Sequence, residues 1–370
     1  MPGGARRTYA HHVMSVVNVL FLEDGAQTAE SVARWLASVV ATARVSLDLA
    51  IYDFHLEGES ADILVEALHE RQRAGVALRI LYNGPRTLPS QGVVVDPGNP
   101  DLTAAFLAAS SLAAQPVGDA GGSHLMHHKY LLVDAGTPDA RLWTGSANLT
   151  TAAFTRQENN LLEIASPELV TAYAADFEQL WRARVIGGSG GAGATVTIDT
   201  KGREATVEVR FAPGQGAAID EEVARRIEGA RRDVTVASVV LSSGRILQAL
   251  TGAAARALPL SGIVDISQMD DVVEMWRRTP TSAWKADTFE ALVRYGRLHG
   301  KRSSRGWPAG PHDYMHNKVI VVDDTVITGS YNFSVNAQSN AENILFIESP
   351  SLALAYRAYI GRLLLRYPPV

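Results

Sequence analysis

Hydrophobic positions along the chain follow two periods, and the same order of predicted elements occurs twice. Residues 28–42 and 217–230 carry apolar side chains at helical spacing. Each of these segments precedes an apolar, strand-like run, at 44–52 and at 232–241. Because strands alternate with helices in both halves, the pattern predicts an α/β fold built from mixed, mostly parallel sheets flanked by helices.

Each half also closes on a helix with a matching apolar face. Both helices are predicted to begin at a Ser-Pro pair, at positions 166 and 349, because proline suits the first helical turn. Apolar residues then recur every three or four positions, and we assign them to the core. They are Leu169, Tyr173, Phe177 and Leu180 in the first helix and Leu352, Tyr356, Ile360 and Leu363 in the second.

A polar motif is repeated between these elements, with the same residue types in the same order. The first copy consists of His127, Lys129, Asp134, Gly145, Ser146, Asn148 and Glu158. The second copy consists of His316, Lys318, Asp323, Gly329, Ser330, Asn332 and Glu342. The copies are 189 positions apart at the histidines and 184 at the glycines, because the first copy has a longer turn after its aspartate. The chain therefore contains an internal duplication.

The chemistry of the motif suits a phosphate group. Residues 129–133 and 318–322 are apolar and β-favouring, so both segments are predicted to be buried strands. Side chains two apart on a strand share a face, so His127 and Lys129 point the same way, as do His316 and Lys318. Lysine neutralises a phosphate oxygen, and imidazole attacks phosphorus or carries a proton. The Gly-Ser-x-Asn turn adds a hydroxyl and a carboxamide that can hold phosphate oxygens.

This pair of copies resembles the phospholipase D superfamily, whose defining signature is the same motif in duplicate. The resemblance extends over nearly the whole chain, from about position 18 to 366. It implies two similar α/β halves related by a pseudo-twofold axis, with one active site shared between them. It also implies a two-step phosphodiester cleavage through a covalent phosphohistidine, without metal or other cofactor.

The resemblance also implies a role for each matching residue. His127 is the expected nucleophile, and His316 the expected general acid and base. The phosphate oxygens are expected to be bound by Lys129, Lys318, Asn148 and Asn332, with Ser146 and Ser330 in support. Glu158 and Glu342 are expected to orient the second nitrogen of each histidine, as the carboxylate of a catalytic triad does. Asp134 and Asp323 are expected to be structural, because their odd offset from the histidine points them away from the phosphate face.

Three further residues lie near the first copy of the motif. Arg156 replaces an asparagine found in the second copy; it is either a further phosphate ligand or an exposed residue of the turn. His128 points away from the nucleophile by strand alternation, so packing or hydrogen bonding is its expected role. His124, in the approach to the first motif, either lines the cleft or lies on the surface.

Length and composition limit the classes of protein. A chain of 370 residues with 46% hydrophobic and 20% charged residues is typical of a globular protein of two domains and excludes collagen-like, coiled-coil and disordered classes. We place the first half at 1–186, a glycine-rich linker at 187–195 and the second half at 196–370. There is no cysteine, which excludes disulfides and a cysteine nucleophile.

Charge and hydropathy suggest the setting of the reaction. Residues 1–190 carry 13 basic and 20 acidic side chains and residues 191–370 carry 21 and 19, for a net charge of −5, which argues against wrapping long nucleic acid by charge alone. The longest apolar runs are shorter than the ~20 residues of a membrane-spanning helix, so no transmembrane segment is predicted. We expect a cytoplasmic enzyme. Its oligomeric state is left open, and a monomer is plausible because one chain holds both motifs.

The substrate is left open among three hypotheses. The segment 277–305 is basic and aromatic, and Arg294, Arg297 and Lys301 are predicted to lie near one helical face. Such a segment fits a groove for single-stranded nucleic acid, peripheral contact with an anionic membrane, or a solvated charged surface. Residues 329–343 look more like the bacterial nuclease members, so a nuclease-type phosphodiesterase is favoured. The alternative is a phospholipase D that hydrolyses or transfers a phospholipid headgroup. The third hypothesis is an inactive scaffold or binding protein.

Overall fold

A computed structural model describes residues 17–84, 100–119, 123–187, 193–200, 203–304 and 310–370. Most of the predicted linker, 188–192, lies outside the described residues. Strand β10 already begins at position 194, inside the range assigned to that linker.

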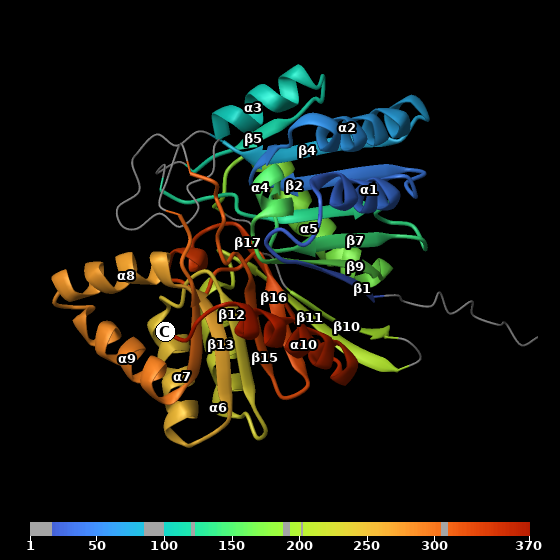
Figure 1. Ribbon diagram of the computed structural model, residues 1–370. Helices are drawn as coiled ribbons and strands as arrows, with labels where there is room; N and C mark the ends of the chain where they lie inside the picture. Colours follow the sequence, from blue (N-terminus) through green and yellow to red (C-terminus); the bar gives the residue numbers. More distant parts are fainter. Residues whose placement is uncertain (1–16, 85–99, 120–122, 188–192, 201–202, 305–309) are drawn as a thin grey trace, which may run out of the picture.

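The first half is built on a mixed sheet that, within the described residues, has seven strands in the order β1-β9-β7-β6-β2-β4-β5 (Figure 1). Its strands are β1 (Val17–Leu22), β2 (Ser46–Ile51), β4 (Ala77–Asn83), β5 (Gln115–Val117), β6 (Lys129–Val133), β7 (Arg141–Gly145) and β9 (Asn159–Ala165). A small parallel pair, β3 (Phe54–His55) and β8 (Leu149–Thr150), lies beside it. The helices are α1 (Ala29–Val40), α2 (Gly58–Arg73), α3 (Pro100–Ala109), α4 (Thr151–Thr155) and α5 (Pro167–Ala183).

The second half repeats this plan with an eight-stranded sheet, counted over the described residues, in the order β10-β11-β17-β16-β15-β12-β13-β14. Its strands are β10 (Ala194–Asp199), β11 (Glu204–Ala212), β12 (Val234–Ser238), β13 (Leu260–Asp265), β14 (Arg297–Lys301), β15 (Lys318–Val322), β16 (Thr325–Gly329) and β17 (Glu342–Glu348). The helices are α6 (Gly216–Glu228), α7 (Gly244–Ala255), α8 (Ile266–Arg278), α9 (Ala283–Tyr295) and α10 (Pro350–Arg366), with a short 3₁₀ turn η1 (Asn336–Gln338).

The α/β fold in two similar halves is confirmed, but the expectation of mostly parallel pairing is wrong. Among the described strands of the two large sheets, only β2-β4-β5 and β12-β13-β14 pair in parallel, and the other neighbours are antiparallel. The reason is the short connection after each motif strand. A turn of a few residues joins β6 to β7 and β15 to β16, and only antiparallel strands can be joined without a crossover.

The predicted helix starts match the structure because their caps are encoded locally. Ser166 and Ser349 lie just before α5 and α10, and their side chains accept hydrogen bonds from the backbone N–H groups of Leu169 and Leu352. The proline that follows each serine occupies the first turn, where no N–H partner is needed. Thr28 caps α1 in the same way.

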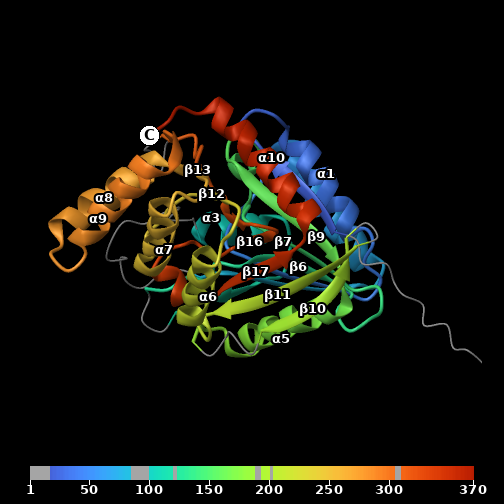
Figure 2. The ribbon, with the colours of Figure 1, turned by 90° about the horizontal axis from the view of Figure 1, so that it is seen from below.

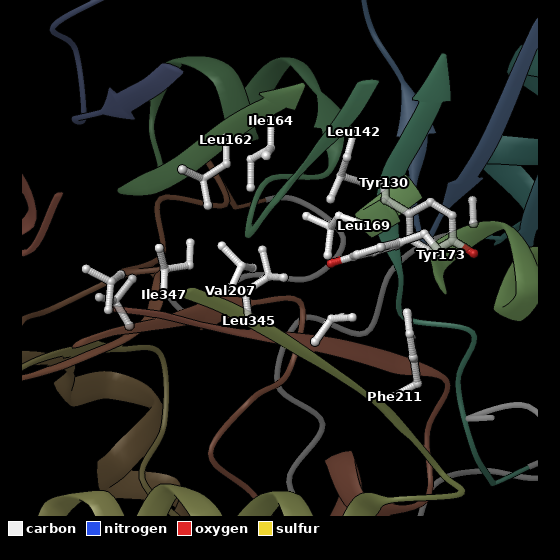
Figure 3. Close-up of a cluster of buried hydrophobic side chains, with 14 of the residues drawn as sticks. Tyr130, Leu142, Leu162, Ile164, Leu169, Tyr173, Val207, Phe211, Leu345 and Ile347 are labelled. Atoms are coloured by element: carbon white, nitrogen blue, oxygen red, sulfur yellow. The ribbon is translucent and has the colours of Figure 1, made fainter. Parts of the chain in front are cut away.

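The two sheets meet through one shared apolar core (Figure 3). Tyr130, Leu162 and Tyr173 of the first half face Val207 and Leu345 of the second, and all of these side chains are buried. Helices α5 and α10 run beside this interface (Figure 2), and all eight of their predicted core residues are buried. Burying one continuous core holds the halves in a fixed relation, which a site shared between them requires.

One part of the second half lies away from this interface. Helices α8 and α9 project from the body of the molecule (Figures 1 and 2). Among the described residues, no helix combines the length and the apolar character needed to cross a membrane.

Candidate active site

Both motif histidines lie at the junction of the two halves. His127 and His316 come two residues before β6 and β15, and each is 1% exposed. The backbone N–H of His127 donates to the carbonyl of Ala341 at 2.9 Å, and that of His316 donates to the carbonyl of Glu158 at 3.1 Å. Each histidine is therefore positioned by backbone from the opposite half.

The ring nitrogens are also held across the junction, by two different groups. Nδ1 of His127 lies 2.8 Å from Oε2 of Glu342. Nδ1 of His316 lies 3.0 Å from Oδ1 of Asn159. Glu342 therefore occupies the expected position, whereas the expectation that Glu158 orients a histidine is wrong, because Asn159 takes that place.

The strand register explains the correction. Gly145 pairs with Leu161 and Gly329 with Ile344, so the residues two before each partner, Asn159 and Glu342, are equivalent. Between the Gly-Ser-x-Asn turn and this position the first half forms the α-helical turn α4, whereas the second forms the shorter 3₁₀ turn η1. This stretch is one residue longer in the first half than in the second. Equal spacing along the sequence therefore matches Glu158, rather than Asn159, with Glu342.

Glu158 belongs to a buried ionic cluster instead. Its Oε2 accepts from Nζ of Lys301 at 2.8 Å, and its Oε1 accepts from the hydroxyl of Tyr367. Nζ of Lys301 also donates to the carbonyl of Arg156 at 2.9 Å and lies 3.4 Å from Oδ2 of Asp24. Glu158 and Lys301 are 0% and 4% exposed. Through Lys301 and Tyr367, this cluster joins β14 and the end of α10 to the first half.

The two lysines complete the site symmetrically. Nζ of Lys129 donates to the carbonyl of His127, and Nζ of Lys318 donates to the carbonyl of His316, both at 2.8 Å. Both lysines are fully buried. Sequence reasoning missed Tyr52, whose ring centroid lies 4.6 Å from that of His127 and 4.8 Å from Nζ of Lys129. Its only signal was its place at the end of the predicted strand 44–52.

The two serines hold the partners of the histidines. The hydroxyl of Ser146 donates to Oδ1 of Asn159, and that of Ser330 donates to Oε2 of Glu342, each at 2.7 Å. Both serines were expected to support the phosphate, and their described contacts instead fix the groups that orient the imidazoles. Asn148 and Asn332 follow in the same turns; Oδ1 of Asn332 is buried and has no hydrogen-bond partner among the described residues.

Glycine is required at the start of each of these turns. Gly145 and Gly329 have φ of +152° and +148°, in the region that favours glycine. A Cβ atom on Gly145 would lie 2.2 Å from the carbonyl oxygen of Asn160, and one on Gly329 would lie 2.4 Å from that of Asn343. The close approach of the two strands places Ser146 and Ser330 beside the histidine partners.

The motif aspartates face away from the histidines. The carboxylate of Asp134 accepts from the backbone N–H groups of residues 44, 45 and 46 at 2.7 to 3.0 Å. Asp323 accepts in the same way from residues 231, 232 and 233. Each aspartate holds the start of the neighbouring antiparallel strand, β2 or β12, against the end of the motif strand, which is a structural contact.

Burial and nearby positive charges disfavour the protonated form of His127. Burial, followed by the positive charges of Lys129 and Lys318, holds the pKa of His127 well below its ordinary value. Burial raises the pKa of Glu342 to about 8, against the opposing pull of Lys129 and the hydroxyl of Ser330. A neutral imidazole is the form that can attack phosphorus.

The described contacts of three nearby residues place them outside the catalytic centre. Arg156 is exposed at the end of α4. His128 is fully buried, with Nε2 3.0 Å from Oδ2 of Asp176 and Nδ1 3.2 Å from Nδ2 of Asn343, so it joins the halves rather than the site. His124 pairs with Asp119 at 3.1 Å, with 42% of its side chain exposed.

The basic segment does not form the predicted helical face. Arg297 and Lys301 lie on strand β14, and Lys301 is buried against Glu158. Arg277 pairs with Glu290 and Arg302 with Asp270. Position 305, the last of this segment, lies outside the described residues. Acidic neighbours therefore offset much of its positive charge.

Comparison with known proteins places this geometry in a family. The family model described as "Cardiolipin synthase, PLD-like domain" matches residues 36–181 and again residues 223–364. The chain belongs to the phospholipase D superfamily. The two matches correspond to the two halves of the fold, and each contains one complete histidine–lysine motif of the superfamily.

Curated relatives match over part of the chain. A mitochondrial cardiolipin hydrolase of Danio rerio is 32% identical over 143 residues, which is 38% of this chain and 53% of that protein. A phospholipase D of Rickettsia bellii is 28% identical over 155 residues, 40% of this chain and 65% of that protein. Across the curated relatives the match spans between 21% and 65% of their own lengths.

A solved structure shares the whole architecture. The crystal structure of a phosphatidylserine synthase from Haemophilus influenzae superposes with a TM-score of 0.63, covering 95% of this chain and 86% of that one. The identity is 12%, so this likeness concerns the fold alone. The likeness extends over both halves of the fold.

Proposed function

We propose that the protein hydrolyses a phosphodiester through a phosphohistidine formed on His127. The observation that carries this proposal is the paired arrangement at the junction: two buried imidazoles, each with Nδ1 held by a group from the opposite half, beside two buried lysines. Holding Nδ1 as the donor leaves Nε2 of each ring for the phosphorus or for a proton. The lysines and the Gly-Ser-x-Asn turns supply positive charge and donors for the phosphate oxygens.

The reaction proceeds in two balanced steps. Nε2 of His127 attacks phosphorus, the bond to the leaving alkoxide breaks, and Nε2 of His316 gives that oxygen its proton. Water then attacks the phosphohistidine and gives a proton to His316, and the P–N bond breaks to release a phosphomonoester. Each histidine returns to its starting state, so the cycle is catalytic.

A phospholipid is the substrate class that we favour. Relatives from two groups carry the names cardiolipin hydrolase and phospholipase D, and the matching family model is described by a lipid enzyme. The nuclease-type reading stays a prediction, and it loses support from the basic segment, where Lys301 is buried and Arg277 and Arg302 are paired. The cytoplasmic location also stays a prediction.

A two-substrate assay tests the proposal. Vesicles of cardiolipin or phosphatidylcholine and single-stranded DNA are offered in EDTA to the wild type, His127→Asn and His316→Asn. His69→Asn, which changes a histidine on the outer helix α2, serves as the matched control. We expect lipid hydrolysis by the wild type and the control and a loss of at least a thousandfold in both motif variants. Cleavage of DNA alone would transfer the site to nucleic acid, and unchanged activity of His127→Asn would refute the mechanism.

A further inference from the structure

The two histidines have chemically different partners, although the halves are otherwise close copies. Glu342 presents a carboxylate to His127, whereas Asn159 presents a neutral carboxamide to His316. One supporting contact is the same for both partners: a serine hydroxyl donates to each at 2.7 Å. At this contact the two partners differ in charge alone.

The groups around each partner suit its chemistry: acceptors surround the carboxamide of Asn159, and a donor faces the carboxylate of Glu342. Nδ2 of Asn159 donates to the carbonyl of Ala153 at 3.2 Å and to Oε1 of Gln157 at 3.3 Å, so its far side faces two acceptors. Gln157 is held in that orientation, since its Nε2 donates to the carbonyl of His312 at 2.9 Å. A carboxylate at position 159 would meet both acceptors without a proton to donate.

The equivalent neighbour in the second half is a donor. Asn340, two residues before Glu342 as Gln157 is before Asn159, accepts from the backbone N–H of Leu125 at 2.9 Å. This turns its Nδ2 toward Oε1 of Glu342 at 3.3 Å. Each half is therefore built for its own partner, a carboxylate in one and an amide in the other, and the orientation of Asn159 is fixed by its contacts.

We propose that Asn159 is the positioning residue of His316 and that the Glu342–Asn159 difference divides the two chemical steps between the histidines. This inference rests on the phosphodiester hydrolysis proposed above. His127 gains positive charge when it attacks phosphorus, and Glu342 stabilises that charge as it develops. His316 starts protonated and loses its charge to the leaving group, so a neutral partner does not hold back the proton.

The same arrangement makes the second step the slower one. His316 must then take a proton from the attacking water and become positively charged, and Asn159 offers its imidazolium no opposite charge. The phosphohistidine therefore forms faster than it is hydrolysed and accumulates on the enzyme. A substrate with a p-nitrophenolate leaving group separates the two roles, because this group leaves without a proton. Its burst reports the nucleophile, and the slower linear phase reports the base.

Rapid mixing of the full chain with a p-nitrophenyl phosphodiester in EDTA tests the inference. The wild type should release close to one nitrophenolate per site in a burst, followed by a slower linear phase. Glu342→Gln should slow the burst on the order of 10- to 100-fold, as expected for loss of a charged hydrogen-bond partner. Asn159→Asp should speed the linear phase about tenfold and leave the burst rate unchanged.

An aspartate at position 159 would face two acceptors. Asn159→Asp is therefore also combined with Gln157→Ala, which removes one of these acceptors. Gln157→Ala alone is the matched control. Effects on the opposite phases, or an equal loss in both phases, would overturn the division of roles. Linear release without a burst in the wild type would overturn the slow second step. Absence of any nitrophenolate release would instead count against the proposed function itself.

Discussion

The buried Lys301–Glu158 pair offers a sharp test, because the sequence motif alone would place Glu158 in the catalytic machinery. The change is Glu158→Gln, which keeps the shape and removes the charge. The backbone carbonyl of Glu158 still accepts from His316, and Asn159 still holds the ring, so the catalytic geometry is preserved. What changes is the environment of Lys301, which is 4% exposed and loses its partner at 2.8 Å.

The expected cost can be worked from the contacts that remain. Removing one partner of a buried ion pair destabilises a protein by about 3–5 kcal/mol. Asp24 at 3.4 Å and the carbonyl of Arg156 at 2.9 Å continue to face the ammonium group, so we expect the lower end of this range, about 3 kcal/mol. At a slope near 3 kcal/mol per molar urea, the unfolding midpoint should fall by about 1 M.

The assay combines urea unfolding with turnover of a p-nitrophenyl phosphodiester by the folded protein. Turnover should stay within about twofold of the wild type. Glu163→Gln, which changes a carboxylate that pairs with the half-exposed Arg141, is the matched control and should cost less than about 1 kcal/mol. Adding Lys301→Met to Glu158→Gln should restore part of the lost stability. A hundredfold loss of turnover with an unchanged midpoint would refute the reasoning and return Glu158 to the chemistry.

Three further predictions concern the turn, the pH profile and the motif aspartates. Gly329→Ala should lower the midpoint of thermal unfolding, because the new Cβ would lie 2.4 Å from a carbonyl oxygen. Gly361→Ala, whose Cβ would have nothing within 4 Å, should leave the midpoint unchanged, and equal midpoints for the two variants would contradict this. The value of kcat/KM should rise with pH through about 8, because burial raises the pKa of Glu342 to about 8 and only the ionised carboxylate can stabilise the positive charge that develops on His127. A flat profile between pH 7 and 9, or the same rise in Glu342→Gln, would argue against this explanation. Asp134→Asn should cost about 1–3 kcal/mol in urea unfolding without changing the burst rate, because a carboxylate that accepts three backbone N–H groups is lost, and a changed burst rate would speak against a structural role.

The fold was predictable where local patterns and the duplication agree. Strands 129–133 and 318–322 appear at the predicted positions because apolar, β-favouring residues between polar ends specify a buried strand without tertiary information. The caps at Ser166 and Ser349 are equally local. The direction of strand pairing was not predictable from apolar periodicity, because the short turns after Val133 and Val322 set it.

The site was predictable for the residues that the motif itself contains, and not for their partners. Equal spacing in the two copies pointed to Glu158, and only the strand register, with one extra residue in α4, shows that Asn159 is equivalent to Glu342. The position of Tyr52 depends on the neighbouring strand β2, and that of Lys301 on β14 and the chain end. Such contacts between distant elements leave no periodic trace in a single sequence.

The central claim is that histidines from two halves act in sequence on one phosphorus atom. The most direct measurement is the mass of the covalent adduct, mapped by peptide after an alkaline quench, when His316→Asn and His127→Asn are each mixed with a p-nitrophenyl phosphodiester. We predict that His316→Asn accumulates the phosphoryl group on His127, because attack remains possible while the base that activates water is missing, and that His127→Asn carries no adduct. An adduct on His316, or none on either histidine in the two variants, would contradict the account.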